Sequence, residues 1–421
     1  MKELSISLMS LLLLLVMIGI KTKTIFRLNK SSFYSITVLG YIITRFILVI
    51  IMYMLLNRQG PGDLLDVFFP QAFMAKYGRL VYNDFESSYA LLFPYLLSLP
   101  LFLWEHHLSI VLFFIFFEIL VLFISVKYII PQFEIGTRDF LWIFTFCPIN
   151  VMFTVYYAQD EIILAFFMVL AFALLINKKQ FFATIVLILG FYFTKLISVY
   201  FFIPLLLTVE KKYLFLFIVG ILIPNAIIYS VGVDLLMPLA EGKLKAIGPN
   251  IWSLLGSLKI VIDPKISYVF LLLSMGVLVL IQFRIKHFWN KNKFEINSVL
   301  NFILLYSFVF MSFSTKSFSF YFLIIIVFYL ILILNYLKDK QVSLYQLMTK
   351  YDHNLSPSLL YIFLLSVSYI FSKVLWNPEL LNFASLFSYI VILFTFIIQL
   401  KLIYTISGYM LGNQIKKIRL F

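Results

Sequence analysis

The chain has 421 residues, of which 63% are hydrophobic and 12% charged, and it carries a formal net charge of +14. An ordinary soluble domain is only about half apolar, so this composition excludes a soluble globular protein. Apolar runs of about 17–25 residues recur, and this is the length that crosses a bilayer as a helix. The sequence therefore predicts an all-α, polytopic transmembrane bundle of about 11–13 spans, embedded in the cell membrane.

The basic balance has two general explanations, which are nucleic-acid binding and basic cytoplasmic loops. In a chain this apolar, the positive-inside rule accounts for the Lys and Arg, so the expected partner is the lipid bilayer and no nucleic acid. A single cysteine, Cys147, excludes an internal disulfide and a Cys-rich metal site.

The predicted helices follow one another along a single integral-membrane domain that covers residues 1–421. Residues 181–209 form one apolar stretch between "NKKQ" and "EKKY", interrupted near Lys195. We expect two short helices there, because broken helices are tolerated where they line a cavity. The remaining expected spans are 5–20, 34–56, 108–126, 139–157, 161–176, 213–231, 266–286, 297–313, 318–337, 358–375 and 384–407.

The longest early connection is the loop 57–107, which we expect to lie outside and to carry juxtamembrane helices. Within it, Pro94 and Pro100 argue against a spanning helix over 89–104. With this loop outside, the cytoplasmic loops hold 20 Lys and Arg against 6 Asp and Glu, whereas the outer loops hold 9 against 11. This asymmetry places the acidic loops on the extracytoplasmic side.

Two acids open this outer loop in "GPGDLLD", and Asp63 and Asp66 are three residues apart. On an α-helical turn they share a face. A carboxylate here suits a general base that deprotonates an acceptor hydroxyl. The alternative is a helix cap, because Asp is favoured before an apolar turn.

A second acidic group stands in "VYYAQDEIILAFF", between two apolar segments. Asp160 and Glu161 cap the following helix or, with water and a phosphate, hold a divalent cation such as Mg²⁺ or Mn²⁺. No cofactor is certain. Lys195 lies far from either basic anchor, and it either reaches the interface or binds an anionic phosphate.

Two later stretches carry further candidates for the outer face. In "GPNIWSLLG", Asn250 and Trp252 could hydrogen-bond and stack on a sugar, or Trp252 could be an interfacial anchor. In "STKSFSFYFL", Lys316 and Tyr321 are placed on the same face. Glu118, within "FFIFFEILVLF", is expected to make a buried contact between helices.

The order of these motifs resembles the C-type superfamily of integral-membrane glycosyltransferases, most closely the bacterial relatives of the GPI mannosyltransferases. The resemblance covers roughly residues 60–330 and departs from the family pattern at Tyr89-Ala90-Leu91, Ala158-Gln159-Asp160, Lys195-Leu196 and 317–321. It implies a shared core over 34–209 and variable helices over 210–421.

The resemblance also implies a function. The protein would move mannose or another hexose from a polyprenyl-phosphate donor to a cell-envelope glycan or lipid acceptor, at the outer face of the membrane. Asp63 or Asp66 would be the catalytic base. The donor phosphate would meet Asp160, Glu161, Lys195, Lys316 and Tyr321, and the substrate would meet Gln159, Asn250 and Trp252. A flippase or transporter of lipid-linked glycans, or a polymerase of them, remains an alternative.

Overall fold

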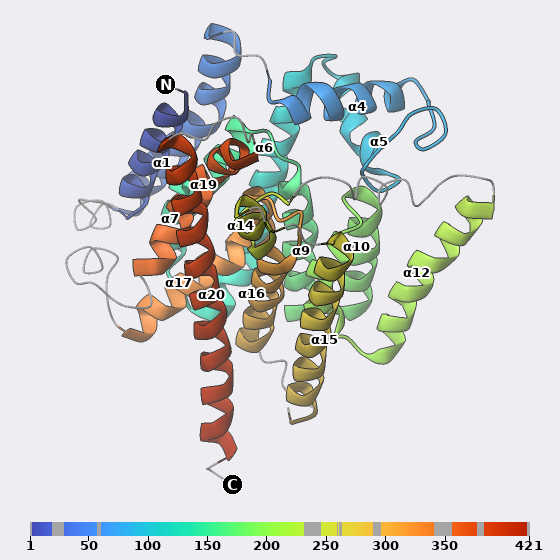
Figure 1. The fold of residues 1–421 in the computed structure, drawn as a ribbon, viewed down its shortest axis with the longest axis vertical. Helices are drawn as coiled ribbons and strands as arrows, with labels where there is room; N and C mark the ends of the chain where they lie inside the picture. The colour runs from blue at the N-terminus through green and yellow to red at the C-terminus, as the bar shows by residue number, and fades with distance from the viewer. Residues whose placement is uncertain are drawn as a thin grey trace. The chain divides into compact units, whose positions relative to one another are not determined.

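The structure is a computed structural model that describes residues 2–18, 29–56, 60–230, 246–258, 260, 263–288, 296–340, 356–376 and 383–418. Within these ranges every regular element is a helix (Figure 1). The chain divides into two compact units, which are described separately. Unit 1 contains Met1–Phe33, Arg138–Ile149 and Lys245–Phe421, and unit 2 contains Tyr34–Thr137 and Asn150–Leu244.

The first helix of unit 2 is α3 (Lys30–Ile42), which continues through π-helical turns to Leu55. The residues of α3 before Tyr34 belong to unit 1. Short helices in the first loop precede α6, and α9 and α10 then pack side by side (Figure 1). The described helices are α4 (Phe69–Lys76), α5 (Phe93–Ser98), α6 (His107–Ile124), α9 (Glu161–Ile176), α10 (Gln180–Phe193), α11 (Ser198–Leu206) and α12 (Lys211–Ser230), with π-helical turns at Asp63–Phe68 and Val151–Tyr156.

Unit 1 consists of longer helices around a buried polar seam. Gln399 of this seam is fully buried, accepts a hydrogen bond from the Tyr361 hydroxyl at 2.8 Å and donates to Ser312 Oγ at 2.5 Å. Its described helices are α1 (Lys2–Ile18), α7 (Thr137–Phe146), α8 (Pro148–Asn150, which ends in unit 2), α14 (Ile251–Ser257), α15 (Pro264–Phe288), α16 (Ile296–Phe313), α17 (Ile326–Lys340), α19 (Ser356–Trp376) and α20 (Phe383–Ile418).

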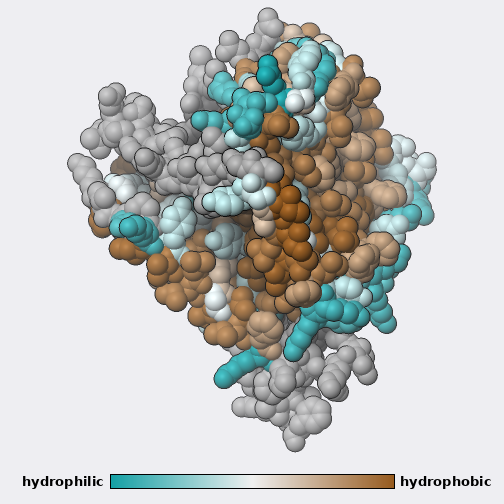
Figure 2. Space-filling view, turned by 90° about the vertical axis from the view of Figure 1, so that its right-hand side faces the viewer, coloured by the Kyte–Doolittle hydropathy of each residue, from teal (hydrophilic) through white to brown (hydrophobic). Residues whose placement is uncertain are grey.

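The helices are those of a multi-pass membrane protein. Among the described residues, seven helices are long and apolar enough to cross a membrane, or eight with one bent pair. Other predicted spans, such as 161–176, coincide with shorter apolar helices. Apolar side chains cover the middle of the face drawn in Figure 2, and hydrophilic ones gather toward its upper and lower ends.

Three segments for which the sequence made a specific prediction can be compared with the structure. The stretch 181–209 is two helices, α10 and α11, and the predicted break near Lys195 is confirmed. The expected span 139–157 is instead bent by 43° between α7 and α8, because Pro148 lacks an N–H and cannot continue a helix. In 89–104 the structure has only α5 and a 3₁₀ turn, Leu99–Phe102.

Candidate functional site

The centre of the site is the break between α10 and α11 in unit 2. Thr194 leaves the helical conformation there, with φ −133° and ψ −120°, and its hydroxyl donates to the Gly190 carbonyl at 2.6 Å. Gly190 allows the close packing that holds the break, because a Cβ would lie 2.8 Å from Phe202 and 2.9 Å from Phe167. The residue that follows, Lys195, is thus placed by a packed turn.

Lys195 is paired with both acids of the predicted second group. Its Nζ lies 2.9 Å from Asp160 Oδ1 and donates a hydrogen bond to Glu161 Oε1. The two carboxylate side chains are 2% and 1% exposed, and the Lys195 side chain is 15% exposed. Asp160 occupies the N-cap position of α9, but its side chain makes no capping hydrogen bond. Both acids therefore pair with the lysine, and Asp160 does not act as a side-chain cap of α9.

Tyr89 of the first loop closes this group on one side. The Lys195 ammonium lies 5.0 Å from the centroid of the Tyr89 ring, which stacks on Phe93 at 4.2 Å. Two backbone hydrogen bonds of 3.0 Å, Ala90 N to Thr194 O and Leu92 N to Tyr192 O, hold the loop against the break. Burial raises the pKa of the Tyr89 phenol, and the negative charge of Asp160 adds to the rise.

The structure distinguishes the two acids of the first loop. Asp63 is half-buried, and its Oδ2 accepts a hydrogen bond from Gln159 Nε2 at 3.1 Å. Asp66 is exposed. The expectation of one shared face assumes α-helical geometry, whereas Asp63–Phe68 is a π-helical turn in which residues three apart diverge. Gly62, and neither acid, occupies the N-cap position, and no side chain caps this turn.

The assembled site has more carboxylates than cations. Asp160 and Glu161 share one ammonium, Lys195, and the charge of a third acid, Asp63, acts on Asp160. Burial raises the pKa of Asp160, opposed by Lys195. Glu161 Oε2 and Ser198 Oγ are buried and have no hydrogen-bond partner among the described residues. Each of these oxygens can accept a hydrogen bond.

The side chains of this site could supply only some of the ligands that a divalent cation needs. Asp160 and Glu161 could supply two hard oxygen ligands, the type that Mg²⁺ and Mn²⁺ prefer. The described part of the chain contains no group of three or more His, Cys, Asp or Glu side chains placed to hold a metal ion. Any further ligands would have to come from substrate or water.

Four of the predicted site residues belong to unit 1 and gather around one crossing of two segments. Asn250 is fully buried, caps α14 by accepting from Ser253 N at 2.8 Å, and donates to Ser317 Oγ at 2.8 Å. The crossing requires glycine at 248, since φ is +105° and a Cβ would lie 1.9 Å from the Ser317 carbonyl oxygen.

The neighbours of Asn250 are held in the same way. Trp252 donates from Nε1 to the Phe313 carbonyl at 2.5 Å, Lys316 forms an isolated bridge with Ile247, and Tyr321 is buried beside Phe318. All four residues belong to unit 1, whereas Lys195 belongs to unit 2.

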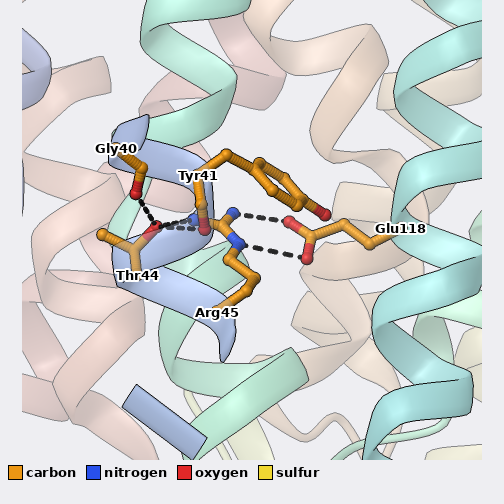
Figure 3. Close-up of polar contacts among 5 residues, drawn as sticks. All are labelled: Gly40, Tyr41, Thr44, Arg45 and Glu118. Carbon is orange, nitrogen blue, oxygen red and sulfur yellow. Dashed lines mark hydrogen bonds and ion pairs between the residues drawn. The ribbon is translucent and has the colours of Figure 1, made fainter. Parts of the chain in front are cut away.

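A second buried charged group consists of two residues, of which the sequence analysis predicted only one. Glu118 has the interhelical contact predicted for it, and its partner is Arg45, which the sequence reasoning overlooked (Figure 3). The guanidinium donates from Nε to Oε2 at 3.2 Å and from Nη2 to Oε1 at 2.5 Å, and both side chains are 0% exposed. A lone charge in each of two apolar runs was the signal available, because such charges are expected to pair.

Comparisons with protein-family models, curated proteins and solved structures each found no match to this chain. Function is therefore argued from the geometry of unit 2 and from the motif order.

Proposed function

We propose that the protein is a membrane glycosyltransferase that takes a hexose from a polyprenyl-phosphate donor and transfers it to a glycan or lipid acceptor on the extracytoplasmic side. One observation carries the proposal. Side chains from three separate segments, the first loop, the turn at 159–161 and the break at Lys195, converge in a buried charged group. These are the segments whose motifs resemble the C-type glycosyltransferases.

In the proposed reaction, Asp63 accepts the proton of the acceptor hydroxyl. The hydroxyl oxygen forms a bond to the anomeric carbon of the sugar while the bond from that carbon to the phosphate oxygen breaks. Polyprenyl phosphate is the leaving group, and fixed charges aimed at the developing negative charge lower the barrier. Lys195 is the cation proposed for this, because its ammonium lies beside the turn at 159–161 and ammonium groups are common point-charge partners of phosphate.

The two carboxylates beside Lys195 have a defined part in this proposal. An unpaired ammonium in an apolar segment costs about 2.5–3.5 kcal/mol on insertion scales, and Asp160 and Glu161 offset that cost before the donor binds. Asn250, Trp252, Lys316 and Tyr321 stay predicted donor or substrate contacts on the strength of the resemblance alone. The proposal does not need a metal ion.

The test uses the acid pair of the first loop as a matched set. Membrane vesicles are given a labelled polyprenyl-phosphate hexose and an acceptor, and bond transfer is measured for the wild type, Asp63→Asn and Asp66→Asn. We expect Asp63→Asn to lose about 10²–10⁴ in turnover, the contribution of a general base, and Asp66→Asn to stay close to wild type. Transfer by Asp63→Asn at the wild-type rate would refute the assignment of the base.

The broken helix at Lys195 also favours a second function, a flippase of lipid-linked glycans, because transporters bind substrates at discontinuous helices. The same vesicles separate the two functions. Movement of the intact donor across the membrane without a new glycosidic bond supports the flippase, and bond formation supports the transferase.

A further inference from the structure

The side-chain amide of Gln159 has no hydrogen left for a ligand. Nε2 donates to the Tyr157 carbonyl oxygen at 2.9 Å and to Asp63 Oδ2 at 3.1 Å, and Gln159 is 2% exposed. A primary amide carries two N–H bonds, so both are used. Gln159 is therefore occupied with Asp63, whereas the resemblance implied a contact with the substrate.

The backbone at this glutamine is held in an unusual conformation. Ala158, directly before it, has φ +48° and is fully buried, although it is not a glycine. The Gln159 backbone N–H donates to the Phe153 carbonyl at 2.8 Å, which closes the turn. A non-glycine residue in the left-handed region persists only where its surroundings impose it, and such positions cluster at functional sites. The turn thus fixes the direction of the Gln159 side chain.

Asp63 receives this contact on one oxygen only. Its Oδ2 accepts from Gln159, and the described residues offer Oδ1 no hydrogen-bond partner. The two residues are 96 positions apart, so the bond ties the first loop to the turn before α9. A carboxylate anchored through one oxygen presents the other in a fixed direction, which is the arrangement a general base needs.

We infer that Gln159 is a positioning residue: its amide sets the orientation of the Asp63 carboxylate so that the second oxygen meets the acceptor hydroxyl. This inference rests on the proposed transferase function. The N–H groups of Gln159 therefore act on Asp63 and not on sugar or phosphate. A small displacement of a reacting group is enough to lower turnover about a hundredfold, so losing the amide should reduce kcat much more than it changes KM.

The experiment is a double-mutant cycle on purified full-length protein. Gln159→Met keeps the length and removes both donors, Gln159→Glu keeps the shape and places a carboxylate against Asp63, and each is combined with Asp63→Asn. We expect Gln159→Met to lose about 10–100-fold in kcat with little change in donor KM, and Gln159→Glu to lose more because like charges repel. In the Asp63→Asn background, Gln159→Met should cause no further loss.

Gln399→Met is the matched control. That glutamine is also buried and also donates two hydrogen bonds, to Ser312 and to the Phe308 carbonyl, but it belongs to unit 1, whereas the acids belong to unit 2. It should lower thermal stability and keep the kcat of the folded fraction. Wild-type kcat in Gln159→Met, or losses that add in the double variant, would overturn the inference alone. Absence of transfer by the wild type would overturn the proposed function and this role with it.

Discussion

The ion pair between Arg45 and Glu118 offers a quantitative test of how this protein tolerates charge inside the bilayer. Both side chains lie within helices that are long and apolar enough to cross a membrane, Lys30–Leu55 and His107–Phe133, and neither is exposed. Only 22% of the most apolar part of the first of these helices is buried inside the protein. The pair is therefore a principal polar attachment of a helix whose side chains are mostly not buried inside the protein, and its loss should be measurable.

The two partners should not be equivalent. Arg45→Met leaves a lone carboxyl, which can bind a proton and become neutral. Glu118→Leu leaves a lone guanidinium, which cannot lose its proton in a protein. Arg45 does keep Thr44 Oγ1 as an acceptor at 2.8 Å and the Tyr41 ring at 4.7 Å, but neither carries a formal negative charge (Figure 3).

Removing one member of a buried pair typically costs about 3–5 kcal/mol. We expect Glu118→Leu to destabilise the protein by about that amount, and Arg45→Met by roughly 1–3 kcal/mol because its lone carboxyl can be neutralised. The double variant should return to within about 1 kcal/mol of wild type, since no buried charge remains and apolar packing replaces the pair.

The free energy of unfolding would be measured by titrating SDS into detergent-solubilised protein, with the melting temperature from fluorescence-detected size-exclusion chromatography as a second readout. Lys212→Met is a matched control for a salt bridge that is exposed, since the side chains of Lys212 and Glu210 are 65% and 57% exposed. It should change stability little. A double variant whose cost equals the sum of the two single losses, or a larger loss in Arg45→Met than in Glu118→Leu, would refute the reasoning.

Three other perturbations test the site and its supports. Lys195→Met should destabilise the protein by roughly 1–3 kcal/mol, because the carboxyls left behind can be neutralised as in Arg45→Met, and it should abolish transfer. Adding Asp160→Asn and Glu161→Gln should restore stability in the same SDS titration without restoring transfer, and full activity in the single variant would contradict the role of the lysine. Ala158→Gly should be neutral or slightly stabilising, because an L-residue with positive φ costs about 1–2 kcal/mol, and Ala158→Val should lower the melting temperature. Equal melting temperatures of the two variants would count against strain at this turn. Tyr192→Phe should lower the free energy of unfolding by roughly 1–2 kcal/mol. Pro224 has no N–H to donate to the Gly220 carbonyl four residues earlier, and the Tyr192 hydroxyl donates to that carbonyl instead. An equal loss in the exposed control Tyr229→Phe would contradict this reasoning.

Several features of the site were predictable from the sequence because charge is conspicuous in an apolar chain. Lys195 interrupts a long apolar run, so a break and a need for compensation could both be predicted there. Asp160 and Glu161 stand together at a boundary between two such runs. What the sequence could not give was their mutual pairing, since Lys195 and Glu161 are 34 residues apart and two interpretations of each group fitted equally well.

The choice between Asp63 and Asp66 was out of reach for a different reason. Which residues share a helix face was inferred from their spacing on the assumption of an α-helix. Asp63–Phe68 is a π-helical turn, in which residues three apart point in different directions. Similarly, nothing in the spacing of residues indicated that Ala158 would adopt a positive φ. Nor did it indicate that both N–H groups of the Gln159 amide would donate hydrogen bonds within the protein. These outcomes depend on contacts between segments that are distant in the chain.

The two buried charged groups of unit 2 differ in a way that separates structure from function. Arg45 and Glu118 balance one positive charge with one negative charge, and the guanidinium fork is matched to both carboxylate oxygens. Such a pair is complete and has no use for a ligand. The group at Lys195 instead pairs two carboxylates, Asp160 and Glu161, with one ammonium, and the charge of Asp63 acts on Asp160 as well. Unbalanced charge in an apolar chain is expensive to keep unless it is used. This imbalance, more than the presence of charge, is the reason to place the chemistry at Lys195 and the structural role at Arg45.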